Sequence, residues 1–247
     1  MMHETVIWHL GDITLHARTL IMTWIVMAFL IIMSIIASRR LTSGTPGKLQ
    51  NFLEWIVDFI KSLISDNMDY KKGAPLLSYL LTLIVFIFFS NILGLIPNVF
   101  APLFHWVEFA QLNKILGDVL IASPTADINT TLALATLTII LVLGSGIKYK
   151  GVHYFHHFIE PIPVFLPIHL IDFGAKLMTL AFRLFGNIYA GEVLIAAMLM
   201  IPGLMVAGTL IPMPVWLGFS IFIGAIQSFV FTVLTIAYIS QAVTSES

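Results

Sequence analysis

The chain contains no cysteine and very few charged residues. Lysine, arginine, aspartate and glutamate make up only 10% of its 247 residues, whereas soluble domains carry about 25%. The absence of cysteine excludes disulfides, thiolate zinc sites and covalent haem attachment. A net charge of −1 leaves no basic face for phosphate contacts, so no nucleic-acid partner is expected.

Apolar residues dominate what is present. They account for 59% of the chain, and the mean hydropathy is +0.99. This composition predicts an all-α polytopic membrane protein that forms a single membrane domain over residues 1–247, with no soluble module. The N-terminus lacks a basic region and a small-residue cleavage site, so we expect the first apolar segment to be an uncleaved anchor.

Five apolar segments are candidates to cross the membrane. A span needs about 20 apolar residues, and the last two segments are much longer than that. Between the first two, apolar residues at helical spacing alternate with charges, which predicts an amphipathic helix on the membrane surface. The expected order is an outside N-terminus at 1–18, a span at 19–40, a surface helix at 46–66, spans at 75–97 and 130–147, and long helices at 162–200 and 214–243.

The distribution of lysine and arginine predicts the orientation. The loop 38–73 carries six of them, whereas the loop 98–129 carries only Lys114. Since basic loops stay in the cytoplasm, we expect the N-terminus outside and the C-terminus in the cytoplasm. A bacterial cell membrane is the expected location, with an organelle membrane as the alternative.

Arg183 lies deep inside the fourth apolar segment. Its guanidinium is protonated at any physiological pH. Such a charge at the centre of a membrane helix costs at least about 2.5–3.5 kcal/mol, so intramembrane arginine usually marks a functional site with a partner.

A polar face runs along the same predicted helix. At 100° per residue, five further polar residues fall within about 40° of Arg183. They are His169, Asp172, Lys176, Thr179 and Asn187. Polar groups in lipid face a partner or a water-filled cavity, so this face is a candidate site.

Other polar residues have different placements. Glu192, nine residues after Arg183, points to the opposite face of a straight helix, which suggests a second environment such as an aqueous route. On the last helix, Gln227 is in register with Ser220 and could hydrogen-bond to Arg183 across a hairpin. A structural alternative stays open, in which Arg183 pairs with Asp172 or a carbonyl and only fixes packing.

Several motifs carry a resemblance to a known family. The segment 183–192, RLFGNIYAGE, resembles the signature of subunit a of the F-type ATP synthase, bacterial type. Further similar segments follow the family's order over nearly the whole chain. They are 51–55 (NFLEW), 91–97 (NILGLIP), 123–129 (SPTADIN) and 226–232 (IQSFVFT).

The resemblance implies a stator subunit of a rotary machine that neither makes nor hydrolyses ATP itself. In this family the two long helices form a strongly tilted hairpin against a ring of c subunits, each with a mid-membrane carboxylate. Two aqueous half-channels reach those carboxylates from opposite sides, and Arg183 forces ion release and blocks leakage between them. The implied partners are the c ring, the b-subunit peripheral stalk, the rest of the ATP synthase and membrane lipid.

The resemblance also implies residue roles. Glu192 lines the outer half-channel, with Asn187 and Gln227 near Arg183. Position 220 is a histidine in some members and Ser220 here, so water replaces a glutamate–histidine relay. Less directly, His169 and Asp172 are candidates for the inner half-channel. Lys176 lies outside the signature and its role stays open, while the lack of clustered oxygen ligands favours protons over sodium.

Two other classes of membrane protein share single features with this sequence. A self-contained secondary transporter would use Arg183 to bind an anion, but such folds often show inverted repeats, and none is detectable. A membrane metalloenzyme is suggested by the histidines at 153, 156 and 157, but the other five histidines are scattered. We therefore expect no metal and no cofactor.

Overall fold

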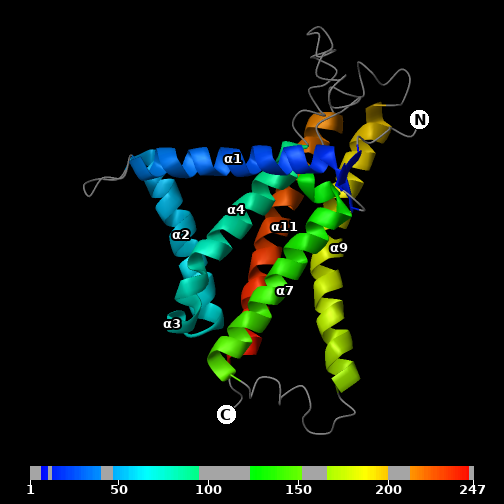
Figure 1. Ribbon diagram of the computed structural model, residues 1–247. Coiled ribbons are helices and arrows are strands. Elements are labelled where there is room, and N and C mark those ends of the chain that lie inside the picture. The colour runs from blue at the N-terminus through cyan, green and yellow to red at the C-terminus, as the bar shows by residue number, and fades with distance from the viewer. Residues whose placement is uncertain are drawn as a thin grey trace. The chain divides into compact units, whose positions relative to one another are not determined.

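The computed structural model describes residues 7–10, 13–39, 47–94, 123–151, 166–199 and 212–244. Several predicted features lie outside these residues: the end of the second span (95–97), most of the loop 98–129, the histidine cluster at 153–157, and the start (162–165) and last residue (200) of the fourth segment. The described elements are mostly helices (Figure 1). In chain order they are β1 (Ile7–Leu10), β2 (Ile13–His16), α1 (Ala17–Arg39), α2 (Lys48–Asn67), α3 (Tyr70–Gly73), a 3-10 turn (Ala74–Leu76), α4 (Leu77–Leu93), a second 3-10 turn (Pro124–Ala126), α7 (Ile128–Lys150), α9 (Leu166–Leu199) and α11 (Pro212–Val243).

Four helical segments are long and apolar enough to cross a membrane. They are Thr19–Arg39, Tyr70–Leu93, Ile128–Lys150 and Pro214–Val243. The prediction of a helical, multi-pass membrane protein is therefore confirmed. Helix α9 is the longest described helix, with 34 residues, and it differs from these four because charged residues interrupt its apolar sequence.

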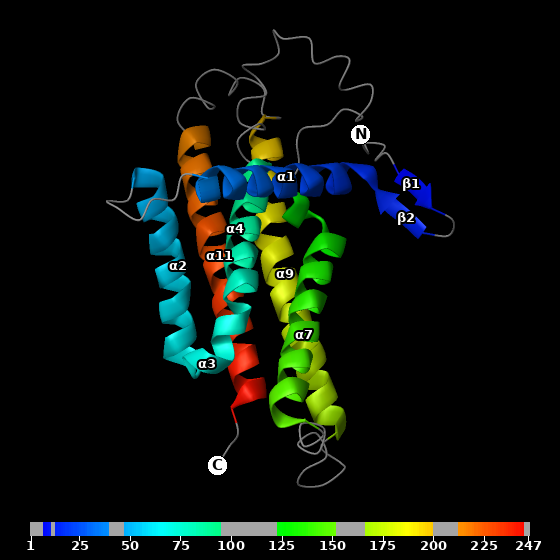
Figure 2. The same ribbon diagram turned by 60° about the vertical axis from the view of Figure 1, so that its left-hand side comes forward.

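A short β-hairpin precedes the first helix, which the all-α prediction did not include. Strands β1 and β2 pair antiparallel, with Ile7 opposite His16 and Leu10 opposite Ile13 (Figure 2). Both strands contain β-branched residues, which favour extended backbone. Only Gly11 and Asp12 separate them, and a Gly-Asp pair between two such runs is a hairpin signal.

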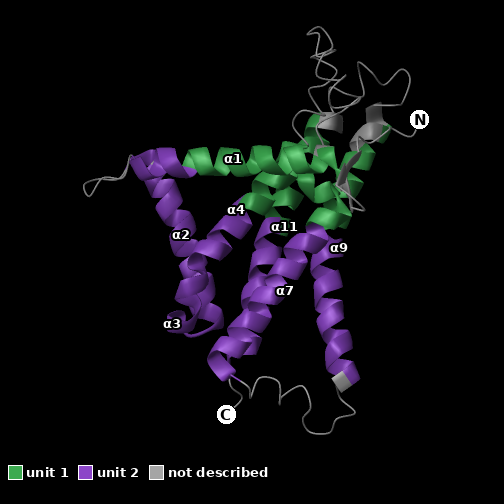
Figure 3. Ribbon diagram, in the orientation of Figure 1, with its two compact units in different colours: residues 1–33, 86–130, 184–227 green, residues 34–85, 131–183, 228–247 purple. Residues whose placement is uncertain are grey.

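The chain divides into two compact units (Figure 3). Unit 1 comprises residues 1–33, 86–130 and 184–227, and unit 2 comprises residues 34–85, 131–183 and 228–247. The boundaries fall inside α1, α4, α7, α9 and α11 rather than in loops. On α9 the boundary lies directly after Arg183.

Unit 2 is held together by apolar contacts of α2. Ile60 and Ile64 of this helix are fully buried and pack with Leu80 of α4 and Ile236 of α11. A second cluster joins Val142 of α7 to the last turn of α11. Helix α2 is therefore anchored along one side, as expected for an amphipathic helix.

The other side of α2 exposes aromatic and charged residues. Phe52 and Trp55 are 55% and 65% exposed, and their rings stack at 6.5 Å. Further along, Lys61 Nζ donates a hydrogen bond to Asp58, and this bond raises the pKa of Lys61. Exposed aromatic residues beside charges suit the boundary between lipid and water.

Unit 1 combines aromatic packing with polar contacts. Phe29 of α1 meets Phe89 of α4 edge to face at 4.9 Å. Near the start of α1, the Thr19 hydroxyl donates to Asp127, just before α7, at 2.8 Å. Further polar contacts of this unit involve Asn91, Glu192 and the Asn187–Gln227 pair, which lie in the candidate site.

Candidate functional site

Arg183 lies on the exposed surface of the chain, in the middle of α9. The residues around it on the helix, Leu180, Ala181, Leu184 and Ile188, are buried, whereas Arg183 points outward. Within the described part of the chain its guanidinium makes no hydrogen bond and no ion pair. The charge that the sequence singled out is thus left uncompensated by the described residues.

Asp172 has a different cationic partner. Lys176, one turn further along α9, approaches the Asp172 carboxylate at 2.9 Å. The Lys176 ammonium also donates to Gln241 of α11 at 3.3 Å and lies 5.4 Å from the centre of the Tyr238 ring. Acidic and basic residues four apart on a helix are well placed to pair. The structural alternative in which Asp172 neutralises Arg183 therefore does not describe this arrangement.

The predicted polar face of α9 is only partly brought together. Asp172 and Lys176 form a pair, and His169, about one turn before Asp172, is half-buried. Thr179 is exposed, like Arg183. This face of α9 therefore carries one ion pair, Asp172 with Lys176, and one separate positive charge, Arg183.

Glu192 is held by a backbone donor on a different segment. The amide of Ser123, just before the second 3-10 turn, donates to Glu192 Oε1 at 2.7 Å. The carboxylate also lies against Gly94 at the end of α4, where an added Cβ would be 2.6 Å from Oε1. These two contacts fix the position of the Glu192 carboxyl group.

Asn91 is the centre of a buried hydrogen-bond network that the sequence analysis did not identify as a site. Its amide nitrogen donates to the carbonyl of Gly224 at 3.0 Å, and its side-chain oxygen accepts from Thr125 at 2.7 Å. The Ser123 hydroxyl donates to the Asn91 carbonyl at 3.2 Å. The network thus fixes the segment whose amide contacts Glu192. The only available signal was that Asn91, Ser123 and Thr125 lie in the two family-like motifs.

Asn187 and Gln227 contact each other between α9 and α11. Asn187 Nδ2 donates to Gln227 Oε1 at 2.9 Å. The sequence suggests Gln227 as a hydrogen-bond partner of Arg183, but in the structure its side-chain oxygen accepts a hydrogen bond from Asn187 instead. The family resemblance predicts both residues near Arg183, but their mutual hydrogen bond is not predictable because the sequence does not reveal the register of the two helices.

Several buried polar atoms of unit 1 have no partner among the described residues. They are Ser90 Oγ, Ser220 Oγ, Gln227 Nε2 and Trp216 Nε1. The approach of Ser220 to α9 is close, because a Cβ on Gly191 would lie 3.8 Å from its hydroxyl. An unsatisfied buried polar group costs about 1–3 kcal/mol. These four atoms are therefore candidates to hydrogen-bond to water or to a group that carries a proton through the protein.

No metal-binding group is found in the described ranges, where no three His, Asp or Glu residues cluster closely enough. The histidines at 153–157 lie outside these ranges. The described site is therefore built of charged and hydrogen-bonding side chains on membrane helices.

These features define a multi-pass helical membrane protein with a few charged residues on otherwise apolar helices. Residues 20–240 match the family model described as ATP synthase A chain. The chain is 38% identical over 243 residues to the ATP synthase subunit a of Desulforamulus reducens, covering 97% of this chain and 84% of that protein. It is 37% and 36% identical to the subunits a of Lysinibacillus sphaericus and Anoxybacillus flavithermus, over the full length of all three chains. The chain belongs to the ATP synthase A chain family, whose members are non-catalytic subunits of the membrane sector.

Proposed function

We propose that this chain is the stator subunit that conducts protons through the ATP synthase membrane sector, with Arg183 facing the carboxylates of a rotating c ring. The observation that carries the proposal is the exposed guanidinium of Arg183, which has no counter-ion among the described residues. A permanent cation on an apolar helix requires a partner, and a carboxylate on another chain would supply it.

The pairing of Asp172 with Lys176 supports this role for Arg183. It neutralises the nearest acid on the same side of α9 within the subunit, at 2.9 Å. Arg183 then remains available as the charge that meets each rotor carboxylate. Its approach would lower the proton affinity of that carboxylate and drive release.

Two groups of polar residues are suited to the two half-channels. The outer route would pass Glu192, with Ser220, Asn187 and Gln227 as further polar contacts. The inner route would use His169 and Asp172, with Lys176 fixing the position of the Asp172 side chain. Because Arg183 lies between these groups in the sequence of α9, it would separate the two routes.

The lengths of α9 and α11 support a tilted hairpin beside the ring. They contain 34 and 32 residues, whereas an upright span needs about 20. At 1.5 Å per residue, α9 is about 50 Å long and exceeds the roughly 30 Å hydrocarbon core. We place the N-terminus outside and the C-terminus in the cytoplasm, on the distribution of basic residues. The b-subunit stalk is the further partner in the membrane.

The test is ion translocation by the whole complex in liposomes. In Arg183→Ala, ATP-driven pumping should be abolished, and the passive proton leak through the membrane sector should rise, because the seal between the routes is gone. Arg183→Lys should remain strongly impaired, since a single ammonium does not reproduce the guanidinium's geometry and can lose its proton. Arg39→Ala, an exposed arginine at the end of α1, is the matched control and should pump normally.

Retention of pumping in Arg183→Ala would refute the proposal. Loss of the subunit from the complex in that variant, with full pumping by Arg183→Lys, would instead assign Arg183 to packing. The subunit reconstituted alone should transport no ion or solute, whereas a self-contained transporter would be active without the ring.

A further inference from the structure

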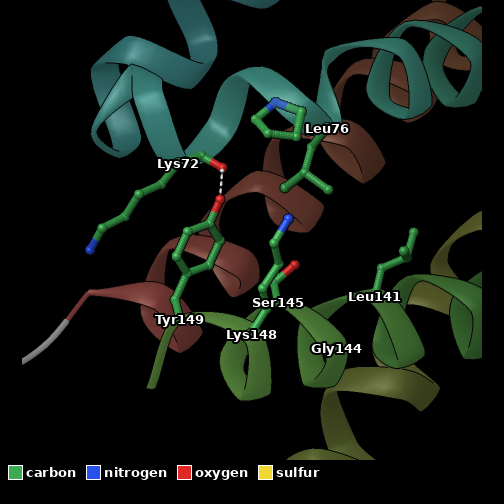
Figure 4. A pocket seen from close by; sticks show the side chains of 8 residues that line it. Lys72, Leu76, Leu141, Gly144, Ser145, Lys148 and Tyr149 are labelled. Atoms are coloured by element: carbon green, nitrogen blue, oxygen red, sulfur yellow. Dashed lines mark hydrogen bonds between the residues drawn. The ribbon is translucent and has the colours of Figure 1, made fainter. Parts of the chain in front are cut away.

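A pocket of about 210 Å³ opens between α3 with its following 3-10 turn and the end of α7, within unit 2 (Figure 4). Its apolar walls include Leu76 on one side and Leu141 and Gly144 on the other. Each water molecule occupies about 30 Å³ in the liquid, so the pocket has room for a group several times larger.

Two lysines flank the Tyr149 ring beside this pocket. Lys72 and Lys148 lie on either side of the Tyr149 ring, with their ammonium groups 5.9 and 5.7 Å from its centre (Figure 4). Among the described residues, neither lysine is paired with a carboxylate. Lys148 is exposed and extends toward Leu76, so its charge is available to a ligand in the pocket.

The pocket is braced by the polar ends of the helices. The Tyr149 hydroxyl donates to the carbonyl of Lys72 at 3.2 Å, which ties the end of α7 to α3. Lys72 Nζ donates to the carbonyl of Val243 at the end of α11 at 3.3 Å. Lys72 and the Tyr149 ring are therefore held in place before any ligand arrives.

We propose that this pocket binds the phosphodiester headgroup of an anionic phospholipid, with Lys148 as the main phosphate contact. The walls belong to two membrane-spanning segments, Tyr70–Leu93 and Ile128–Lys150, at their basic ends. That position is the boundary between lipid and water, where lysine clusters attract anionic headgroups. A lipid also places its glycerol and upper acyl carbons against Leu76 and Leu141, which a free phosphate ion leaves uncovered.

The experiment uses the intact ATP synthase in phosphatidylcholine vesicles that contain a small fraction of photoreactive phosphatidylglycerol. The readout is the labelling of residues 141–149 per assembled complex. Lys148→Gln should reduce labelling about fivefold, the value expected for the loss of about 1 kcal/mol of attraction per lysine. Lys148→Arg should keep it. Lys150→Gln removes a charge from the same helix end without touching the pocket, and should leave labelling unchanged.

A second variant tests the pocket without altering charge. A Cβ at Gly144 would meet no atom within 4 Å, so the backbone accepts a side chain there. Gly144→Leu should fill the pocket and lower labelling by a similar factor. Unlabelled phosphatidylglycerol should compete for the site, whereas added phosphatidylcholine should not.

Three results would overturn the proposal. Equal losses in Lys148→Gln and Lys150→Gln would indicate a general surface field. Unchanged labelling in Gly144→Leu would show that the pocket is not the binding site. Displacement of the lipid by millimolar inorganic phosphate would assign the site to the free ion.

Discussion

Lys176 and Asp172 form an ion pair on α9 with a separation of 2.9 Å, while Arg183, seven residues after Lys176, has no counter-ion in the described part of the chain. The pair explains how one helix can carry two cations and yet present one unneutralised charge. It also gives a role to Lys176, which the sequence left open. Lys176 neutralises Asp172 and links α9 to α11 through Gln241.

The first prediction concerns this pair. Lys176→Gln or Asp172→Asn alone leaves an unpaired charge on a helix that we place in the membrane, at a cost of about 2.5–3.5 kcal/mol. Each single variant should lower the amount of subunit in the purified complex. The double variant should recover most of it, because both charges are gone. Quantitative immunoblots would measure this, and equal losses in the single and double variants would contradict a neutralising role.

The second prediction concerns the space beside Glu192. Gly94→Ala would place a Cβ 2.6 Å from Glu192 Oε1 and 2.5 Å from the Ser123 hydroxyl. Overpacking of this kind costs about 1–3 kcal/mol and would displace the carboxylate. We expect assembly to persist while ATP-driven pumping falls at least severalfold. Gly174→Ala, where an added Cβ meets nothing within 4 Å, is the matched control on α9. Equal pumping rates in both variants would show that the position of Glu192 is unimportant.

The third prediction concerns Asn91. Asn91→Leu keeps the approximate volume but leaves the Thr125 hydroxyl and the Gly224 carbonyl without their present partners. Each unsatisfied buried group costs about 1–3 kcal/mol. The temperature at which the subunit dissociates from the complex should therefore fall by several degrees. Asn129→Leu, at an exposed position, should change it little. An unchanged dissociation temperature in Asn91→Leu would mean that the network contributes no stability.

The fourth prediction separates stability from transport at the Asn187–Gln227 contact. Interhelical hydrogen bonds in membranes average only about 0.6 kcal/mol, so Asn187→Leu should assemble almost normally. If the pair contributes to the ion path, pumping should nevertheless fall severalfold, since Gln227 loses the donor to its oxygen at 2.9 Å. Normal pumping in an assembled Asn187→Leu complex would reduce this contact to helix packing.

The sequence predicted the helices better than the contacts between them. Runs such as Thr19–Arg39 and Pro214–Val243 are detectable because hydropathy accumulates over some 20 residues. The β-hairpin at Ile7–His16 was overlooked because two four-residue strands give a weak signal beside membrane spans. The Asp172–Lys176 pair could have been recognised from its spacing of four residues.

The network around Asn91 could not have been predicted in the same way. Its members come from α4, from the segment before α7 and from α11, and no local periodicity connects them. Similarly, the contact between the Ser123 amide and Glu192 joins positions 69 residues apart. Such pairings depend on how helices align along their lengths, and a single sequence does not record that alignment.

The exposed guanidinium of Arg183 has a consequence for biogenesis. With a rotor carboxylate as the proposed partner of Arg183, a newly inserted copy would carry an energetic penalty until that carboxylate arrives. The free subunit would then be less stable in the membrane than the assembled one. Surplus copies would be held in that less stable form, open to proteolysis and to wrong pairing. The relative rates at which the cell makes this chain and its partner would therefore affect how many unassembled copies accumulate and how well the membrane holds back ions.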